Sequence, residues 1–185
     1  MKVTTDGCLL GASAFHSSPQ NILDIGSGTG LLSLMIAQRY PESYIDAVEI
    51  EKSAFHQAKQ NIETSPWKNR INIIHSSIQN FSHSSENEYD LIICNPPFYS
   101  NQLKSKDPRQ NIAWHATALS KEDLARISAK HLKEDGFAFY IFPAMESAEF
   151  QLLVHKYGLF TFHKMNHWCP VNPATNDKYT VKSLK

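Results

Sequence analysis

Several features that mark particular classes of protein are scarce in this sequence. Only 3 of the 185 residues are cysteine, Cys8, Cys94 and Cys169, and their wide separation indicates neither a disulfide framework nor a paired Cys-x-x-Cys metal site. No apolar run approaches the roughly 20 residues of a membrane span. An acidic residue, Asp6, stands where a secretory signal would be apolar. We therefore expect a cytoplasmic protein that does not contact a membrane.

The sequence also lacks an excess of positive or of negative charge. The chain has 18 basic and 18 acidic residues, so its formal net charge is zero, and bulk electrostatics gives no support for a nucleic-acid partner. Any such partner would have to be held by a local patch. The hydrophobic content of 42% suits an ordinary globular fold, and the length suits a single domain over residues 1–185, which we expect to be a monomer.

Strand-like and helix-like patterns alternate along the chain. Apolar runs of strand length occupy residues 21–26, 44–50, 71–78, 89–95, 136–142 and 159–165, and helical periodicity occupies residues 30–40, 52–63, 120–132 and 144–158. This alternation predicts an α/β fold with a doubly wound, mostly parallel sheet. The polar stretches at 82–88 and 101–111 predict loops.

The most informative local feature is a glycine cluster between the first strand and the first of these helices. Gly26, Gly28 and Gly30 lie in the segment LDIGSGTG. Glycines permit a tight turn and a close approach of a ligand to the backbone, and the following helix N-terminus favours an electron-rich group there. The spacing G-x-G-x-G, preceded by Asp24, differs from the G-x-G-x-x-G of dinucleotide-binding folds. The cluster therefore predicts a nucleoside cofactor other than NAD.

An acidic residue ends the second strand-like run. Glu49 lies about 20 residues beyond the turn, the spacing at which a carboxylate binds ribose hydroxyls in such folds. Glu51 could take this part instead, and a solvated acid at a strand end is the purely structural interpretation. We expect Glu49 to bind the ribose.

The fourth strand-like run ends in Asn95, Pro96, Pro97 and Phe98. Proline terminates strands and asparagine favours turns, which would explain the tetrad structurally. In an α/β sheet, however, the carboxyl end of a strand borders the ligand crevice. The Asn95 amide oxygen and a fixed carbonyl give two acceptors for the N–H bonds of a planar amine. Phe98 offers a ring for base stacking. The tetrad predicts group transfer to an exocyclic amino group.

The segments LDIGSGTG and AVEIE resemble the first two cofactor motifs of the class I S-adenosylmethionine-dependent methyltransferases, within a likeness over residues 21–141. This resemblance implies a Rossmann-like methyltransferase fold with S-adenosylmethionine as cofactor, bound by the glycine turn, Asp24, Glu49 and Asn95. Such enzymes carry an acid near the adenine after the third strand. Here the segment reads HSSIQNF, so the candidates for that contact are Ser76, Ser77, Ile78 and Gln79.

The N-terminal segment MKVTTDGCLLGA, with Thr5 and Asp6, resembles the bacterial tRNA adenosine N6-methyltransferases that modify valine tRNA next to the anticodon. Together with the tetrad, this resemblance spans residues 2–143. It implies a tRNA anticodon loop as partner, adenosine 37 as the methylated nucleoside, and Thr5 and Asp6 placed over the cofactor. The residues alone leave Thr5 and Asp6 equally suited to cap a helix.

The sequence departs from this family in two ways. Family members begin earlier and end in a strand hairpin, whereas this chain starts inside the motif and finishes in VNPATNDKYTVKSLK, so we expect the N-terminal extension and the C-terminal hairpin to be missing. Trp114 and His115 follow Ala113 where relatives place Ala-Arg, which removes a guanidinium that would bind phosphate. The remaining candidates for a basic RNA patch are Lys104, Lys106, Arg109, Lys164, Lys178 and Lys182.

Other interpretations stay open. The same tetrad occurs in enzymes that methylate guanine N2 in ribosomal RNA or glutamine N5 in a protein, and the chain could also be a non-catalytic cofactor- or RNA-binding module or a nicotinamide oxidoreductase. We predict no metal, because His163, His167 and Cys169 lack a second ligand pair for a four-coordinate site. Cys94 has no evident partner base, so nucleophilic catalysis is not supported.

Overall fold

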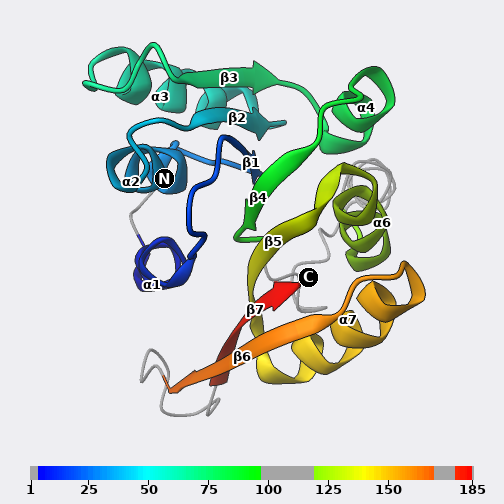
Figure 1. The fold of residues 1–185 in the computed structure, drawn as a ribbon. Helices are drawn as coiled ribbons and strands as arrows, with labels where there is room; N and C mark the ends of the chain where they lie inside the picture. Colours follow the sequence, from blue (N-terminus) through cyan, green and yellow to red (C-terminus); the bar gives the residue numbers. More distant parts are fainter. Residues whose placement is uncertain (1–3, 97–118, 169–177, 185) are drawn as a thin grey trace, which may run out of the picture.

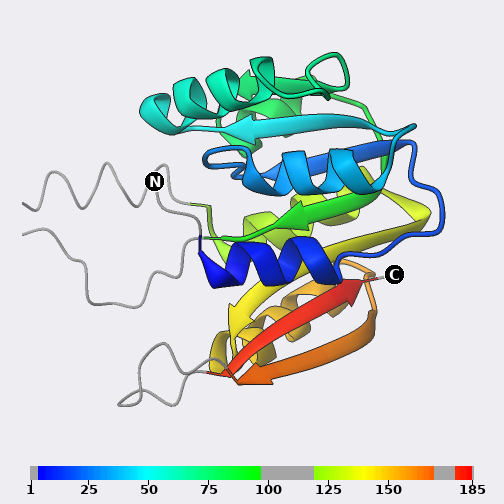
Figure 2. The same ribbon diagram turned by 90° about the vertical axis from the view of Figure 1, so that its left-hand side faces the viewer.

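A seven-stranded sheet, with strand order β3-β2-β1-β4-β5-β7-β6, organises the computed structural model, which describes residues 4–96, 119–168 and 178–184. The strands are β1 (Asn21–Ile25), β2 (Tyr44–Glu49), β3 (Ile71–His75), β4 (Tyr89–Cys94), β5 (Leu132–Pro143), β6 (Thr161–Trp168) and β7 (Lys178–Leu184). The first five are parallel, whereas β7 is antiparallel to both β5 and β6. Figure 2 shows β7 pointing against β4 and β5.

Helices cover both faces of the sheet (Figure 1). One face carries α1 (Thr5–Ser13), α2 (Leu31–Arg39) and α3 (Lys52–Glu63), and the other carries α4 (Ile78–Ser84), α6 (Lys121–His131) and α7 (Ala144–Lys156). Each layer has its own apolar core, one containing Leu10, Ile36 and Ile93 and the other containing Leu23, Leu124 and Phe150. The predicted doubly wound α/β fold with a mostly parallel sheet is confirmed. Among the described helices, none is both long and apolar enough to cross a membrane.

The C-terminal end of the sheet corrects the prediction from sequence. Strands β6 and β7 pair antiparallel over seven register positions from Thr161↔Leu184 to Trp168↔Lys178. The expectation that the C-terminal hairpin is missing was therefore wrong. The sequence does not predict strand β7, because its polar residues give no apolar run. Its place between β5 and β6 depends on pairing with strands that precede it in the sequence. Helix α4 also extends to Ser84, into the stretch 82–88 that was predicted to be a loop.

The C-terminal end of helix α1 is held against α2 by hydrogen bonds. The Arg39 guanidinium, at the end of α2, donates to the carbonyls of Ala14 at 2.6 Å and Ala12 at 3.1 Å. These carbonyls have no partner within the helix, so the contact satisfies acceptors that would otherwise face water. This anchorage holds α1 alongside α2, with its N-terminal turn at the carboxyl ends of the parallel strands.

Candidate functional site

The turn between β1 and α2 forms the first part of the candidate site. Gly26, Gly28 and Gly30 have φ angles of 70°, 57° and 80°, in the left-handed region that glycine adopts at no steric cost. The backbone N–H groups of Gly26 and Ser27 donate to the Val48 carbonyl at 2.9 and 3.1 Å, which fixes the turn against β2. The predicted tight glycine turn in front of a helix is confirmed.

Glu49 ends β2 beside this turn and is only 7% exposed. Its Oε2 accepts from the Gly28 N–H at 2.7 Å, and its Oε1 accepts from the Glu51 N–H at 2.7 Å. A carboxylate has about four acceptor positions, so each oxygen can accept one more hydrogen bond from a ligand. Glu51 instead caps α3, where its side chain accepts from the N–H groups of Ser53 and Ala54 at 2.9 and 2.7 Å. Of the two acids, Glu49 is the one that lies at the turn.

A second acid, Asp24, lies on β1 just before the turn. Its side chain is fully buried, and Oδ2 accepts from the Ser33 hydroxyl on α2 at 2.6 Å. Oδ1 and the buried Ser27 hydroxyl have no hydrogen-bond partner among the described residues. Burial raises the pKa of Asp24 to about 7, against hydrogen bonds from Ser33 that lower it. Asp24 at the end of β1 and Ser27 in the turn therefore each have a buried oxygen atom without a hydrogen-bond partner among the described residues.

Asn95 follows β4, on the opposite side of β1 from Glu49. Because β1, β2 and β4 are parallel, their carboxyl ends lie at the same edge of the sheet. The glycine turn, Glu49 and Asn95 are therefore together at that edge. Asn95 is half-buried and Pro96 is buried. Pro97 and Phe98, the rest of the predicted tetrad, lie outside the described residues. The structure thus brings the first two tetrad residues to the edge that holds the turn.

The N-terminal turn of α1 lies against Asn95. A Cβ atom added at Gly7 would come within 3.8 Å of Asn95 Nδ2 and within 3.4 Å of the first side chain of α2. The helix is capped by Thr4, whose hydroxyl accepts from the Gly7 N–H at 3.2 Å, and not by Thr5 or Asp6. Thr5 is exposed, whereas Asp6 is half-buried and burial raises its pKa. The segment predicted to lie over a cofactor therefore does border the site.

The segment after β3 borders Glu49 on its other side. The Ser76 N–H donates to the Glu49 carbonyl at 3.1 Å. Ser77 caps α4 by accepting from a backbone N–H of that helix at 3.1 Å, and Ile78 is 6% exposed within the apolar core. The Gln79 amide donates to a carboxylate on α6 at 3.5 Å. Of the four candidates for an adenine contact, Ser76 is the one with a hydrogen bond to the Glu49 backbone.

Three residues of this edge were not found from the sequence. Ile50 follows Glu49 directly and is 47% exposed, so it offers an apolar surface to a flat ring; its position next to the predicted ribose acid was the available signal. Ser33 gave no signal, because its hydrogen bond to Asp24 forms only when α2 packs beside β1. Ser27 lies inside the glycine motif, but the sequence gives no sign that its hydroxyl is buried without a partner. In the described part of the chain, no group of three or more His, Cys, Asp or Glu side chains could hold a metal ion.

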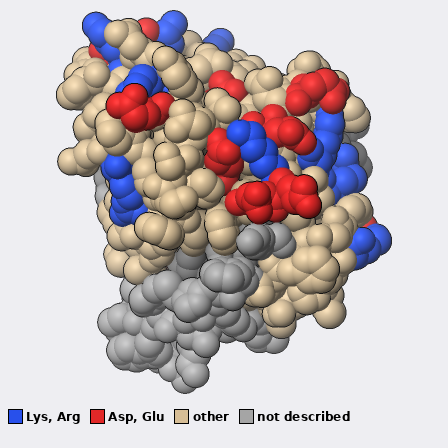
Figure 3. Space-filling view, in the orientation of Figure 1, with Lys and Arg blue, Asp and Glu red and all other residues tan. Residues whose placement is uncertain are grey.

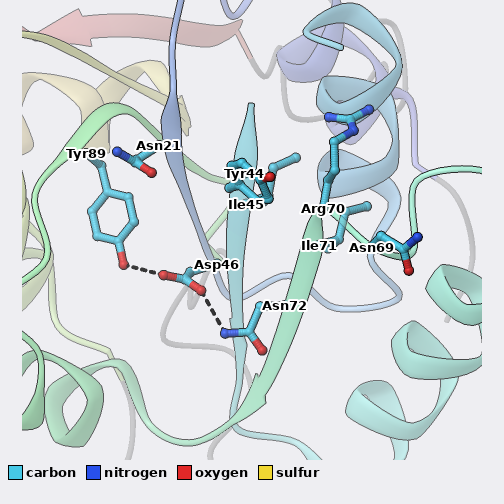
Figure 4. Close-up of a pocket in the computed structure, with 9 residues that line it drawn as sticks. All are labelled: Asn21, Tyr44, Ile45, Asp46, Asn69, Arg70, Ile71, Asn72 and Tyr89. Carbon is cyan, nitrogen blue, oxygen red and sulfur yellow. Dashed lines mark hydrogen bonds between the residues drawn. The ribbon is translucent and has the colours of Figure 1, made fainter. Parts of the chain in front are cut away.

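A separate hollow lies at the opposite end of the strands from the glycine turn, where the parallel strands begin (Figure 4). Its lining includes the first residues of four strands, Asn21, Tyr44, Ile71 and Tyr89. Within it, the Asp46 carboxylate accepts from the Tyr89 hydroxyl at 2.7 Å and, through its other oxygen, from an asparagine amide on β3 at 2.8 Å. The Asp46 carboxylate is thus paired within the protein, and the length of the strands separates the hollow from the glycine turn. We do not include it in the candidate site.

The described surface shows no large area of one charge on the face in Figure 3, where acidic and basic side chains are interspersed. Ion pairs join α6 to α7, namely Lys121 with Glu146 and Glu149, and Lys156 with Glu122. Of the residues predicted to meet RNA, Lys104, Lys106, Arg109, Trp114 and His115 lie outside the described residues. The backbone register places Lys164 opposite Lys182 in the β6–β7 hairpin. Where an RNA patch would lie stays a prediction.

Comparison with known proteins adds to this geometry. A family model described as "methyltransferase small domain" matches residues 6–141. A Dyadobacter fermentans protein named tRNA1(Val) (adenine(37)-N6)-methyltransferase is 49% identical over 150 residues, which are 81% of this chain and 62% of the relative. A Pseudoalteromonas translucida protein of the same name is 46% identical over 186 residues, covering 100% of this chain and 76% of the relative.

Solved structures share the fold. A S-adenosylmethionine-dependent methyltransferase from Thiobacillus denitrificans, solved in complex with S-adenosyl-L-homocysteine, superimposes with a TM-score of 0.65 at 16% sequence identity. The superposition covers 99% of this chain and 91% of that structure. The architecture described above is therefore one that is found in methyltransferases.

Proposed function

The chain belongs to the methyltransferase small domain family, and we propose that it transfers the methyl group of S-adenosylmethionine to the N6 amino group of an adenosine in tRNA. The proposed acceptor is adenosine 37 in the anticodon loop of valine tRNA, modified in the cytoplasm. The observation that carries this proposal is the 46–49% identity to two relatives named for that reaction. The meeting of the glycine turn, Glu49 and Asn95 at one edge of the sheet supports it.

The residues around the turn fit a nucleoside cofactor that carries a positive charge. The free acceptor positions of Glu49 suit two ribose hydroxyls, and Ile50 with Ser76 and Ser77 suits the adenine ring. The unpartnered Oδ1 of Asp24 suits a cationic group. When bound, S-adenosylmethionine supplies a methyl group activated by a positively charged sulfur. Gly26 leaves room for it beside the backbone, because a Cβ atom there would meet nothing within 4 Å, whereas a Cβ atom at Gly30 would face Ala58 and Ile62 on α3.

Asn95 and Pro96 are the proposed binding groups for the acceptor amine. The Asn95 amide oxygen and the Pro96 carbonyl each accept one N–H of the adenosine N6 group. Holding both hydrogens in this way turns the nitrogen lone pair out of the ring system and toward the methyl group. On transfer, the new N–C bond would form as the bond between the methyl carbon and the sulfur breaks, with the electron pair of that bond staying on the sulfur. The positive charge would thus pass from the sulfur to N6, which would then release one proton to water. The two oxygens stabilise that charge, so no side-chain base is required.

Two further parts of the site belong to the same proposal. Thr5 and Asp6, in the first turn of α1, cover the cofactor from the side of Asn95. Pro97 holds the preceding carbonyl in place, and Phe98 stacks on the target adenine, which is worth roughly 1–3 kcal/mol per base. Because an anticodon loop is single-stranded, its bases are displaced at little cost.

The test is a comparison of acceptors. The protein is incubated with methyl-labelled S-adenosylmethionine and, separately, unmodified valine tRNA, a ribosomal RNA fragment and a glutamine-containing peptide. We expect label in the tRNA alone, and its loss in Asn95→Ala. Asn69→Ala, at an exposed position on the opposite edge of the sheet, serves as the matched control and should methylate normally. Label in the ribosomal RNA or the peptide instead would overturn the proposed acceptor, and no label with any of the three would favour a non-catalytic module.

A further inference from the structure

Helix α3 lies against the far end of the glycine turn. A Cβ atom added at Gly30 would come within 3.5 Å of the Ala58 Cβ and within 3.6 Å of the Ile62 side chain. Both of these α3 side chains are buried, so the helix packs directly on the end of the turn. The beginning of the turn is held separately, by the hydrogen bonds of Gly26 and Ser27 to β2.

One side chain of α3 adds a hydrogen bond to this packing. The Asn61 Nδ2 donates to the Thr29 carbonyl at 2.9 Å, and the Asn61 Oδ1 accepts from the Gln57 Nε2 at 3.1 Å. A carbonyl can only accept, so the nitrogen of the Asn61 amide has to face Thr29. The Gln57 donor fixes the same orientation, because it binds the oxygen of that amide. Gln57 and Asn61 are four residues apart, which puts them on one face of the helix.

The bond from Asn61 fixes one peptide plane of the turn. The Thr29 carbonyl and the Gly30 N–H belong to the same planar peptide group. The Gly30 N–H donates to the Ser27 carbonyl at 2.8 Å, so this peptide is held at both of its polar atoms, from α3 and from within the turn. A turn with three glycines has many other backbone conformations open to it. Asn61 therefore restricts the segment that we expect to surround the cofactor.

We propose that Asn61 is a positioning residue for cofactor binding, which acts through the Thr29 carbonyl, and that Gln57 sets the orientation of its amide. Together with the bonds to β2, Asn61 holds the turn in its binding shape before the ligand arrives, which lowers the ordering cost of binding. This inference rests on the proposed function, because the ligand that it concerns is S-adenosylmethionine. Asn61 is half-buried and Gln57 is exposed, so the loss of their hydrogen bonds should affect the turn more than the fold.

The first test compares cofactor affinity and local order in Asn61→Asp and the wild type. This change keeps the shape of the side chain but sets a carboxylate oxygen against the Thr29 carbonyl. We expect S-adenosylmethionine and S-adenosyl-L-homocysteine both to bind about tenfold more weakly, measured by calorimetry. Amide hydrogen exchange should become faster at Gly28 and Gly30 and stay unchanged in β1 and β2, a pattern that a loss of overall stability would not give.

Gln57→Glu tests the orientation of the amide with Asn61 left in place. The new carboxylate would accept from the Asn61 amide nitrogen, so the amide would turn over and present its oxygen to the Thr29 carbonyl. We expect the affinity for both ligands to fall about threefold. Gln60→Glu, the same change at another exposed position on α3, is the matched control and should bind as the wild type does.

The possible results separate this inference from the proposed function. Unchanged affinity in Asn61→Asp, or equal weakening by Gln57→Glu and Gln60→Glu, would overturn the inference and leave the proposed function intact. Faster exchange in β1 and β2 of Asn61→Asp, as well as in the turn, would indicate a purely structural role and would also overturn the inference. No binding of either ligand by the wild type would instead overturn both.

Discussion

The Glu49 carboxylate at the end of β2 accepts a hydrogen bond from the Gly28 N–H in the turn after β1, at 2.7 Å. This bond joins the acid that we expect to bind the ribose to the turn that we expect to surround the cofactor. Because the carboxylate is also held by the Glu51 N–H, its position is fixed before any ligand arrives. Such preorganisation lowers the ordering cost of binding.

Replacement of Glu49 should weaken cofactor binding with little change of shape. Glu49→Gln removes the charge and turns one acceptor oxygen into a donor nitrogen, which would face a backbone N–H or a ribose hydroxyl. We expect a loss of about 2 kcal/mol in binding S-adenosylmethionine, or roughly thirtyfold in Kd, measured by calorimetry. Glu63→Gln, at a side chain that is 62% exposed on the same side of the sheet, should bind normally. Equal affinity of Glu49→Gln and the wild type would contradict the assignment.

The glycine turn allows a prediction with a closely matched control. Gly26 and Gly158 have φ angles of 70° and 79°, and a Cβ at either position would meet nothing within 4 Å. Alanine at each should therefore cost about 1–2 kcal/mol of unfolding free energy through backbone strain alone, measured by urea denaturation. Only Gly26→Ala should also weaken cofactor binding, because Gly158 lies after α7, away from the turn. If both variants bound the cofactor equally well, the turn would have no part in binding.

The hydrogen bonds from Arg39 that hold the C-terminal end of α1 should affect the rate of methyl transfer. Arg39→Met removes the bonds to the last carbonyls of α1, at a cost of about 1 kcal/mol because the side chain is exposed. We expect faster amide hydrogen exchange throughout α1 and a slower methyl transfer, since the first turn of α1 lies next to Asn95. Lys59→Met, on the exposed surface of α3, should change neither. Normal exchange in α1 of Arg39→Met would show that other contacts hold the helix.

The Asp90 carboxylate should make stability depend on acid pH. Although desolvation raises the pKa of Asp90, hydrogen bonds from Lys133 and from the N–H groups of Asn21 and Gln20 outweigh it and lower the pKa below 3.8. A lowered pKa in the folded state gives stability that is present above the unfolded value and is lost as the pH falls through the folded value.

The corresponding measurement is urea unfolding between about pH 5 and pH 2. We expect Asp90→Asn to be less stable by about 1 kcal/mol near neutral pH and to lose less stability than the wild type on acidification. Asp135→Asn, at an exposed position on β5, should keep the wild-type pH dependence. Parallel curves for Asp90→Asn and the wild type would show that the Asp90 contacts do not contribute.

The parts of the structure that depend on local chemistry could be predicted from the sequence. The glycines at 26, 28 and 30 are required by the left-handed backbone of one short turn, and the apolar strands are visible as uninterrupted runs. Strand β7 and helix α4 could not be found in this way. Seven residues of α4 give too little helical periodicity, and the polar strand β7 is stabilised by pairing with β5 and β6.

The residues of the candidate site also divide into those that could be predicted from the sequence and those that could not. Glu49 and Asn95 follow from their places at strand ends, because parallel strands bring such positions to one edge. The incomplete hydrogen bonding of Asp24 and its contact with Ser33 follow only from the packing of α2 beside β1. Likewise, the exposure of Ile50 and the proximity of Gly7 to Asn95 depend on how the layers meet.

The most direct test of the central claim is to identify the modified nucleoside. Unmodified valine tRNA is incubated with the protein and S-adenosylmethionine, digested, and analysed by mass spectrometry for methylated nucleosides and for the modified position. The account predicts N6-methyladenosine at position 37, formed by the wild type and absent with Asn95→Ala. A different methylated nucleoside, or N6-methyladenosine that forms equally well without Asn95, would contradict the assignment of the site.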